Sequence, residues 1–148
     1  MNTVIMLFGL NLAPLYYAIA KVESDLGATA DNVYQLRQIY RDDVARICEL
    51  RNMPAPPAYE KIISMPELSE EAMRVFWEYY GNKFLAKYPR HRITYEYLAR
   101  VHNGGPLGWA KLSTYRYWFK VQDVMARAHP EEIDAYFQER GAYGNVSK

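Results

Sequence analysis

The chain has 148 residues, of which 50% are hydrophobic and 24% are charged, so it is long enough for one folded domain and its composition excludes intrinsic disorder. Its 18 Lys and Arg nearly balance its 17 Asp and Glu, so there is no strong basic field to hold a nucleic acid, and we set that class of partner aside. The single cysteine, Cys48, cannot form an internal disulfide, and the Cys and His residues lack zinc-type spacing, so no metal or other cofactor is expected.

The segment from Val4 to Ala20 is largely apolar, but Asn11 and Pro14 interrupt it. It falls short of the about 20 uninterrupted apolar residues that a membrane span needs. No Lys or Arg precedes Lys21, whereas a classical signal peptide begins with a positive region. We therefore expect this segment to pack on the domain rather than anchor in a membrane, with no classical signal peptide and no stable membrane insertion.

A helix is predicted from Pro14 to about Ser24, because a proline suits the first helical turn and the following residues favour a helix. Its apolar face carries Leu12, Leu15, Tyr16 and Ile19. Glu23, four residues after Ile19, falls on the same face. Burial there would raise the pKa of this carboxyl, by up to about 3–5 units if burial is complete. A glutamic acid that stays protonated near neutral pH suits general-acid cleavage of a glycosidic bond, although a surface residue or an ion-pair partner is the structural alternative.

Small, Gly and Asx residues at 25–32 predict a turn region, and residues 33–36 a short extended piece or a tight connector. The next helix is expected from about Arg37 to Arg51, ended by the three prolines that follow Met53. Its inner side should carry Tyr40, Val44, Ile47 and Cys48. Residues 54–66 are then a loop, with one helical turn at 59–63.

Ser69, followed by two glutamates, predicts the start of a long helix that runs to about Lys87. Thr94 should cap the next helix, which the Asn-Gly-Gly-Pro run at 103–106 ends. Ser113 or Thr114 should cap a further helix to about Ala128. The residues expected to face inward from that helix are Trp118, Val121, Gln122 and Met125.

Pro130 is expected to start a last short helix that Gly141 closes, with a mobile tail at 142–148. Several helices with one short irregular or β-like stretch after the first helix predict a mostly α domain of α+β type. We expect a single domain over 1–148 with its core at about 12–140, and a monomer.

Three motifs follow one another along the chain. The first is Val22-Glu23-Ser24, the second is YQLRQIYRDDVARI at 34–47, and the third is ARVHNGGPLGW at 99–109 with STYRYW at 113–118. They resemble the "ES", the "Y-Q-I" and the "A-Y-N-G-G" with "Y-W" elements of the lysozyme-like superfamily, above all of its lytic transglycosylase and phage-type muramidase (endolysin) families. The order and spacing match over about residues 12–122.

The resemblance implies a role for each matching position. Glu23 would be the catalytic acid, and Ser24 would orient it or touch the sugar. Tyr34 and Gln35 would belong to the substrate-binding element, with Gln35 bonded to substrate or to reaction water. Asn103 would hold an N-acetyl group or the Glu23 side chain, and His102 replaces a Tyr that is common in that element.

The chain departs from the family pattern in two turns. Asp25-Leu26-Gly27-Ala28 stands where a Gly-rich turn is usual after "ES". A Gly usual shortly before "Y-Q" is replaced, with Asn32 nearest, and Asn tolerates the left-handed backbone better than most residues.

The resemblance implies cleavage of the β-1,4 bond between N-acetylmuramic acid and N-acetylglucosamine in peptidoglycan, the expected partner. A single carboxyl suffices for a lytic transglycosylase, which leaves 1,6-anhydro-muramyl ends. A hydrolytic muramidase needs a second carboxylate about 5–9.5 Å away, for which Asp25 and Asp31 are nearest in sequence. The third alternative is a catalytically inactive murein-binding protein with the same fold. The expected place of action is periplasmic or cell-wall murein, and the chain fits a phage protein made in the host cytoplasm or carried in the virion.

Overall fold

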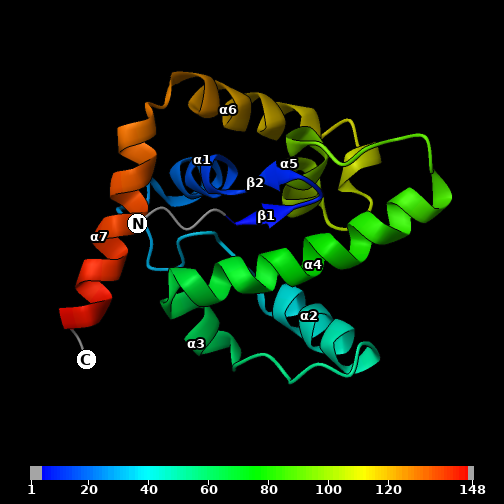
Figure 1. Ribbon diagram of the computed structural model, residues 1–148, viewed down its shortest axis with the longest axis horizontal. Helices are drawn as coiled ribbons and strands as arrows, with labels where there is room; N and C mark the ends of the chain where they lie inside the picture. Colours follow the sequence, from blue (N-terminus) through cyan, green and yellow to red (C-terminus); the bar gives the residue numbers. More distant parts are fainter. Residues whose placement is uncertain (1–4, 147–148) are drawn as a thin grey trace.

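A computed structural model describes the backbone of residues 5–146 and the side chains of residues 5–140 (Figure 1). The elements follow in the order β1 (Met6–Leu7), β2 (Leu10–Asn11), α1 (Ala13–Ser24), α2 (Gln38–Leu50), α3 (Tyr59–Ser64), α4 (Pro66–Lys87), α5 (Tyr95–Gly104), the 3₁₀ turn η1 (Gly108–Ala110), α6 (Thr114–Arg127) and α7 (Pro130–Val146). The described part of the chain is 67% helical, which confirms the predicted mostly α fold with a small β component.

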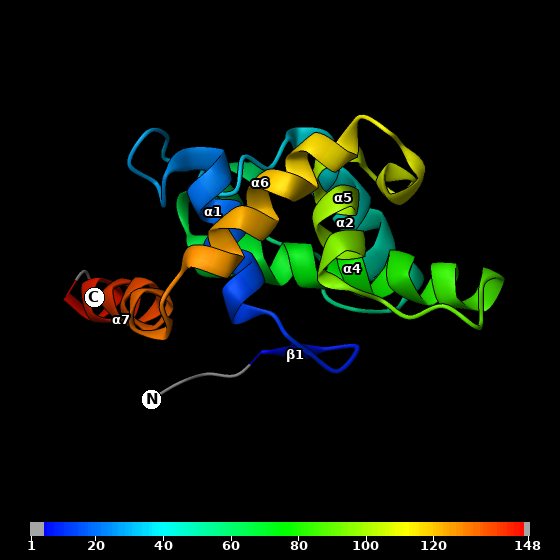
Figure 2. The same ribbon diagram turned by 90° about the horizontal axis from the view of Figure 1, so that it is seen from above.

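Helix α1 lies at the centre of one half of the domain, where it packs against α5, α6 and α7 (Figures 1 and 2). The long helix α4 crosses the other half and carries α2 and α3 on its outer side. The predicted apolar face of α1 is confirmed, because its four members are each at most 1% exposed: Leu12, Leu15, Tyr16 and Ile19. Tyr16 joins the two halves by stacking on Trp77 of α4, with ring centroids 5.7 Å apart.

The small sheet precedes α1. The stretch after α1 is irregular, which is one of the two forms expected for it, and the β-like form is not found there. Strands β1 and β2 form an antiparallel hairpin whose turn residues, Phe8 and Gly9, both have positive φ (51° and 77°). Such a turn matches the twist of paired strands. Residues 25–37 form turns without a strand.

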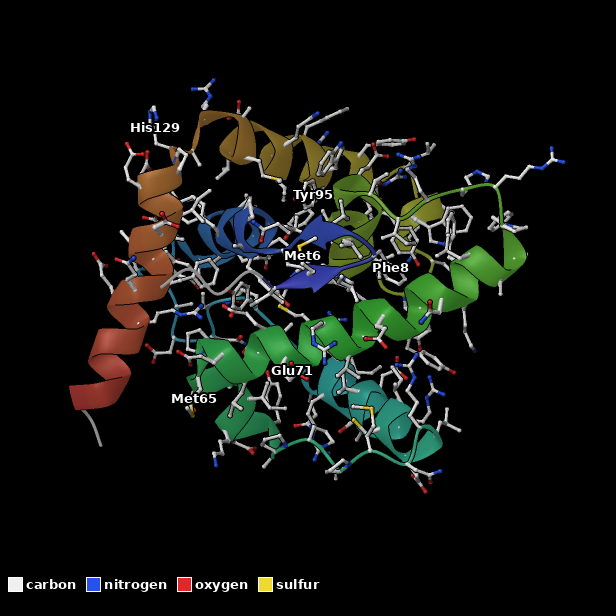
Figure 3. The ribbon with its side chains drawn as sticks, viewed as in Figure 1. Met6, Phe8, Met65, Glu71, Tyr95 and His129 are labelled. Atoms are coloured by element: carbon white, nitrogen blue, oxygen red, sulfur yellow. The ribbon has the colours of Figure 1, made fainter. Side chains whose placement is uncertain are left out.

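Two contacts fix the hairpin on the domain (Figure 3). The Phe8 ring lies on α4 at Gly81, where a Cβ atom would stand 2.6 Å from the ring. The Tyr95 hydroxyl, at the start of α5, donates to the carbonyl of Asn11 (2.7 Å). The apolar N-terminal residues from Ile5 onward therefore pack on the protein, as expected. None of the helices within residues 5–146 is both long enough and apolar enough to cross a membrane.

Helix α4 begins at Pro66, one turn before the predicted start at Ser69. Pro66 supplies the first turn without needing an N–H partner. Ser69 is not a cap, since its hydroxyl is buried and donates to the carbonyl of Ile62 (2.8 Å). Glu70 consequently lies inside the helix and inside the protein, where it is 4% exposed.

The remaining helices largely follow the prediction. Thr94 caps α5 by accepting from the amide of Tyr97 (3.1 Å), and Gly105 ends that helix with φ 83°. Helix α6 starts as expected, but Ser113 makes no side-chain cap bond and Gln122 is exposed, not inward-facing. Helix α7 runs past Gly141 to Val146, so the expected end is wrong; residues 147–148 of the expected tail lie outside the described residues.

Candidate functional site

A cleft of about 780 Å³ lies between the end of α1, the turn at 35–37, helices α2 and α4, and the end of α5. The residues that line it are Glu23, Gln35, Leu36, Arg37, Ile39, Tyr40, Asp42, Asp43, Arg46, Phe76, His102, Asn103, Gly104, Gly105, Pro106 and Lys111. Four of the six residues singled out in the sequence therefore meet here, although they come from three separate segments. Ser24 and Tyr34 do not line the cleft.

Glu23 stands on the last turn of α1 and is partly buried. Burial raises the pKa of its carboxyl, and the nearby hydroxyl of Tyr117 on α6 partly opposes this increase. The Tyr117 hydroxyl is buried and has no hydrogen-bond partner among the described residues, so it acts on Glu23 through its proximity. The surroundings of Glu23 therefore favour the protonated form of its carboxyl, as its position on the apolar face of α1 predicts.

Ser24 orients the chain next to Glu23 but is closed to a ligand. Its hydroxyl is 1% exposed, donates to the carbonyl of Val33 (2.6 Å) and accepts from the amide of Gly27 (2.9 Å). These bonds hold the left-handed turn at Asp25 and Leu26, whose φ angles are 50° and 60°. A hydroxyl buried in this way does not touch a sugar, which corrects that expectation. None of its bonds is to Glu23, so its role in orienting Glu23 stays a prediction.

Tyr34 is fully buried behind the cleft, so the expectation that it binds substrate directly is also wrong. Its hydroxyl donates to the carboxylate of Glu70 and lies 3.0 Å from the hydroxyl of Tyr136. An aromatic residue in a connector can line a substrate groove or belong to the core. Here the hydrogen bond to the buried Glu70 of α4 holds Tyr34 in the core.

The turn after Tyr34 presents Gln35 to the cleft. Gln35 has the left-handed φ of 54°, and its side-chain amide donates to the carbonyl of Asn32 (2.6 Å). The backbone of Asn32 is not left-handed, which corrects the expectation for that residue. Its side chain instead bonds to Leu36, donating to the carbonyl (2.7 Å) and accepting from the amide (3.1 Å). The two bonds of the Asn32 side chain to Leu36 thus hold the turn at a position where the family usually has a glycine.

The end of α5 supplies His102 and Asn103 as neighbours on the cleft wall. Asn103 is exposed, with its amide free to meet a ligand. Burial lowers the pKa of His102 to about 4, against an opposing effect of the Tyr34 backbone, so the imidazole is neutral near pH 7. Its Nδ1 atom is buried without a hydrogen-bond partner among the described residues. His102 is therefore a neutral polar group of the wall.

Helix α2 also contributes to the cleft, which the sequence motifs do not predict. Its residues Ile39, Asp42, Asp43 and Arg46 line the cleft, whereas the acids considered nearest to Glu23 in sequence, Asp25 and Asp31, do not. The signal was present, because positions 39, 42, 43 and 46 recur at the three- and four-residue steps of one helix face. Three of these four side chains are charged, and only the packing of α2 on α4 reveals the cleft beside them.

The two acids of α2 differ in their surroundings. Asp43 accepts from the hydroxyl of Tyr80 (2.5 Å) and from the guanidinium of Arg46 (2.9 Å), so its oxygens are held. Asp42 is exposed and accepts from the side chain of Gln38 (2.9 Å). Within residues 5–140 no three His, Cys, Asp or Glu side chains gather as metal ligands.

No protein-family model matches the chain, and no curated protein matches it. The likeness to the lysozyme-like superfamily therefore depends on the three sequence motifs.

Proposed function

We propose that the protein is a peptidoglycan lytic transglycosylase that cleaves the β-1,4 bond between N-acetylmuramic acid and N-acetylglucosamine, with Glu23 as its acid and base. The observation that carries this proposal is the carboxyl of Glu23 in an open cleft, with its pKa raised by burial and with Gln35, His102 and Asn103 around it. The three motifs, in the order and spacing of that family, support the same substrate.

In the first step Glu23 gives its proton to the glycosidic oxygen, and the bond from that oxygen to C1 of the muramic acid breaks. The carbonyl oxygen of the substrate's own N-acetyl group bonds to C1 and stabilises the positive charge. A protonated carboxyl is required at the start, which is the form that burial of Glu23 favours.

In the second step the ionised Glu23 takes the proton of the C6 hydroxyl on the same sugar. The C6 oxygen then attacks C1 and displaces the N-acetyl oxygen, which closes the 1,6-anhydro ring and restores the protonated acid. One carboxyl therefore serves both steps, and the substrate supplies both nucleophiles.

The acids of α2 keep hydrolysis as the second candidate, because a muramidase needs a second carboxylate on the other side of the scissile bond. Asp42 is the better of the two for this role, since it is exposed on the cleft, whereas Asp43 is held by Tyr80 and Arg46. The products distinguish the two reactions: anhydro ends are lighter by one water than the reducing ends of hydrolysis.

The test is the clearing of a purified murein suspension by the Glu23→Gln variant, followed by mass analysis of the fragments. The matched control is Asp25→Asn, which makes the same acid-to-amide change two residues later, outside the cleft. Asp25 pairs on the surface with Lys21, where such a pair contributes at most about 1 kcal/mol.

We expect the native protein and Asp25→Asn to clear murein with anhydro ends, and Glu23→Gln to be inactive. Reducing ends alone would replace the transglycosylase with a muramidase. If the native protein binds murein and releases no fragment, the chain is an inactive murein-binding protein and the proposal fails.

A further inference from the structure

Leu112, Tyr115 and Phe119 form an exposed apolar stripe at the start of α6. Helix α6 itself lies on the outside of the molecule (Figures 1 and 2). The exposed fractions of these residues are 83%, 39% and 61%. The amide of Tyr115 donates to the carbonyl of Leu112 (3.2 Å), and the rings of Tyr115 and Phe119 stack with centroids 6.2 Å apart. Successive steps of three and four residues place the side chains on one line, outside the core.

The stripe is a fixed part of the fold. Arg100 of α5 is buried, donates to the Thr114 hydroxyl (2.8 Å), and lies with its guanidinium carbon 3.8 Å from the centroid of the Tyr115 ring. One face of that ring is therefore covered by a side chain that is itself held in place. Phe119 and Leu112 extend outward from this support.

Positive charge flanks the stripe. Arg116 and Lys120 each follow one of its aromatic residues and are exposed, and no carboxylate of the described residues lies within ion-pair distance of either. Residues 97–122 contain four basic residues and no acidic one, and of these Arg100 is buried and paired with Glu96. The exposed positive charge beside the stripe is therefore that of Lys111, Arg116 and Lys120.

We propose that this stripe docks the protein on the surface of an anionic lipid bilayer. Leu112, Tyr115 and Phe119 enter the boundary between headgroups and acyl chains, while Arg116 and Lys120 lie among the lipid phosphates. Apolar and aromatic side chains beside long cationic ones are the composition of interfacial helices. A sugar platform is the poorer match, because it needs open aromatic faces, whereas the most exposed member is an aliphatic leucine and Tyr115 gives one face to Arg100.

Docking in this way sets the orientation of the cleft. Lys111 precedes the stripe directly and lines the cleft, together with Gly105 and Pro106 of the preceding loop. This rim of the cleft would therefore lie next to the bilayer surface. The inference is independent of the proposed reaction, because it uses no residue of the acid machinery.

The test is co-sedimentation of the full chain with vesicles of phosphatidylglycerol mixed equally with phosphatidylcholine, and with vesicles of phosphatidylcholine alone. We expect binding to the anionic vesicles that weakens with added salt. The double variant Arg116→Gln, Lys120→Gln should lower the partition coefficient about thirtyfold. The double variant Leu112→Ser, Phe119→Ser should lower it by a similar factor, because it removes the buried apolar area.

Each variant has a matched control elsewhere on the surface. Lys61→Gln with Arg92→Gln removes two exposed charges, and Leu50→Ser with Met53→Ser removes two exposed apolar side chains, 60% and 37% exposed, beside the end of α2. Both controls should bind the anionic vesicles as the native chain does. Circular dichroism of all four variants shows whether each is folded.

Equal binding to neutral and anionic vesicles would overturn the proposal, as would stripe variants that bind no more weakly than their controls. Binding of the stripe to purified murein without any affinity for vesicles would assign the surface to the glycan. Dimerisation that only the Leu112→Ser, Phe119→Ser variant abolishes, again without vesicle binding, would assign it to a second copy of the chain.

Discussion

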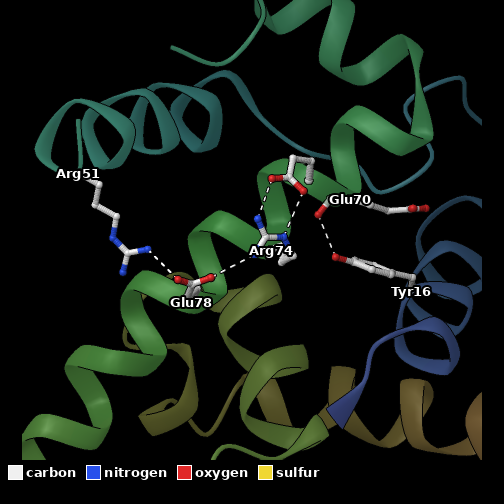
Figure 4. A network of polar contacts seen from close by, with 6 residues as sticks. Tyr16, Arg51, Glu70, Arg74 and Glu78 are labelled. Carbon is white, nitrogen blue, oxygen red and sulfur yellow. Dashed lines mark hydrogen bonds and ion pairs between the residues drawn. The ribbon is translucent and has the colours of Figure 1, made fainter. Parts of the chain in front are cut away.

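The carboxylate of Glu70 on α4 and the guanidinium of Arg140 on α7 form a bidentate ion pair inside the domain, 70 residues apart in sequence. Glu70 is 4% exposed and also accepts from the hydroxyl of Tyr34, while its backbone carbonyl accepts from Tyr16 (2.9 Å). The pair thus connects α7 to α1, α4 and the turn that carries Gln35. The neighbouring face of α4 carries a separate network, in which Arg74 joins Glu71 to Glu78 and Glu78 reaches Arg51 (Figure 4).

Removing one partner of the buried pair should be costly, because it leaves a charge unpaired away from water. We expect Arg140→Met, which keeps most of the aliphatic length, to lower the free energy of unfolding by about 3–5 kcal/mol in urea denaturation. Arg127→Met is the control, since Arg127 pairs with Asp123 on the surface, where both side chains are more than half exposed. Its loss should be at most about 1 kcal/mol. Equal losses in the two variants would contradict a special role for the buried pair.

Tyr34 carries the link from this pair to the cleft, and Tyr34→Phe removes only the hydroxyl. We expect a loss of about 1–3 kcal/mol in stability, because Glu70 loses a buried donor. Faster amide hydrogen exchange at residues 33–36 should accompany it, since the turn loses its anchor on α4. Tyr17→Phe is matched, because that hydroxyl also contacts α7, at the exposed Glu132 (3.3 Å). Tyr17→Phe should leave amide hydrogen exchange at residues 33–36 unchanged. Equally fast exchange there in both variants would show that the Tyr34 hydroxyl does not anchor the turn on α4.

The example of Glu70 shows where sequence patterns reach their limit. Spacing within one helix correctly predicts the inner face of α1, the end of α2 near Arg51 and the Thr94 cap, because each is decided by residues at most a few positions apart. The residue that ends α2 is the left-handed Asn52, before the prolines are reached. The sequence Ser69-Glu70 has the pattern of a helix start, and the error arises because Pro66 begins the helix earlier. The partner that keeps Glu70 buried, Arg140, lies far along the chain.

In the candidate site, too, some residues are predicted correctly by the sequence and others are not. Motif and spacing predict that Glu23, Gln35, His102 and Asn103 come together, and they all line the cleft. Ser24 and Tyr34 belong to the same motifs, yet their hydroxyls face the protein. Which way a motif residue points depends on acceptors supplied by other segments, such as the carbonyl of Val33 and the carboxylate of Glu70.

His102 should make stability depend on pH. Its pKa is lowered to about 4 in the folded protein, whereas a histidine of the unfolded chain titrates near pH 6.5. Between these values the unfolded chain binds more protons, so stability falls as the pH falls through this window, by about 3 kcal/mol in total. We expect His102→Phe to remove this slope, measured as the difference from the native chain in urea denaturation at pH 7, 5.5 and 4. A constant difference between the two proteins across this window would show that the imidazole is not buried neutral.

Tyr117 should set the acidity of Glu23, and Tyr117→Phe tests this while keeping the ring. The hydroxyl is the group that opposes the effect of burial on the carboxyl, so its removal should raise the pKa of Glu23 further. If cleavage needs the protonated acid, activity falls as the pH rises through this pKa, and the alkaline limb of the pH–rate profile should move to higher pH in the variant. Tyr115→Phe, two residues earlier on α6 and exposed, is the matched control and should leave the limb in place. A shift of the limb to lower pH would mean that the Tyr117 hydroxyl stabilises the protonated form of Glu23. That result would reverse the effect assigned here to the Tyr117 hydroxyl. It would not decide whether Glu23 is the catalytic acid, which the Glu23→Gln variant tests.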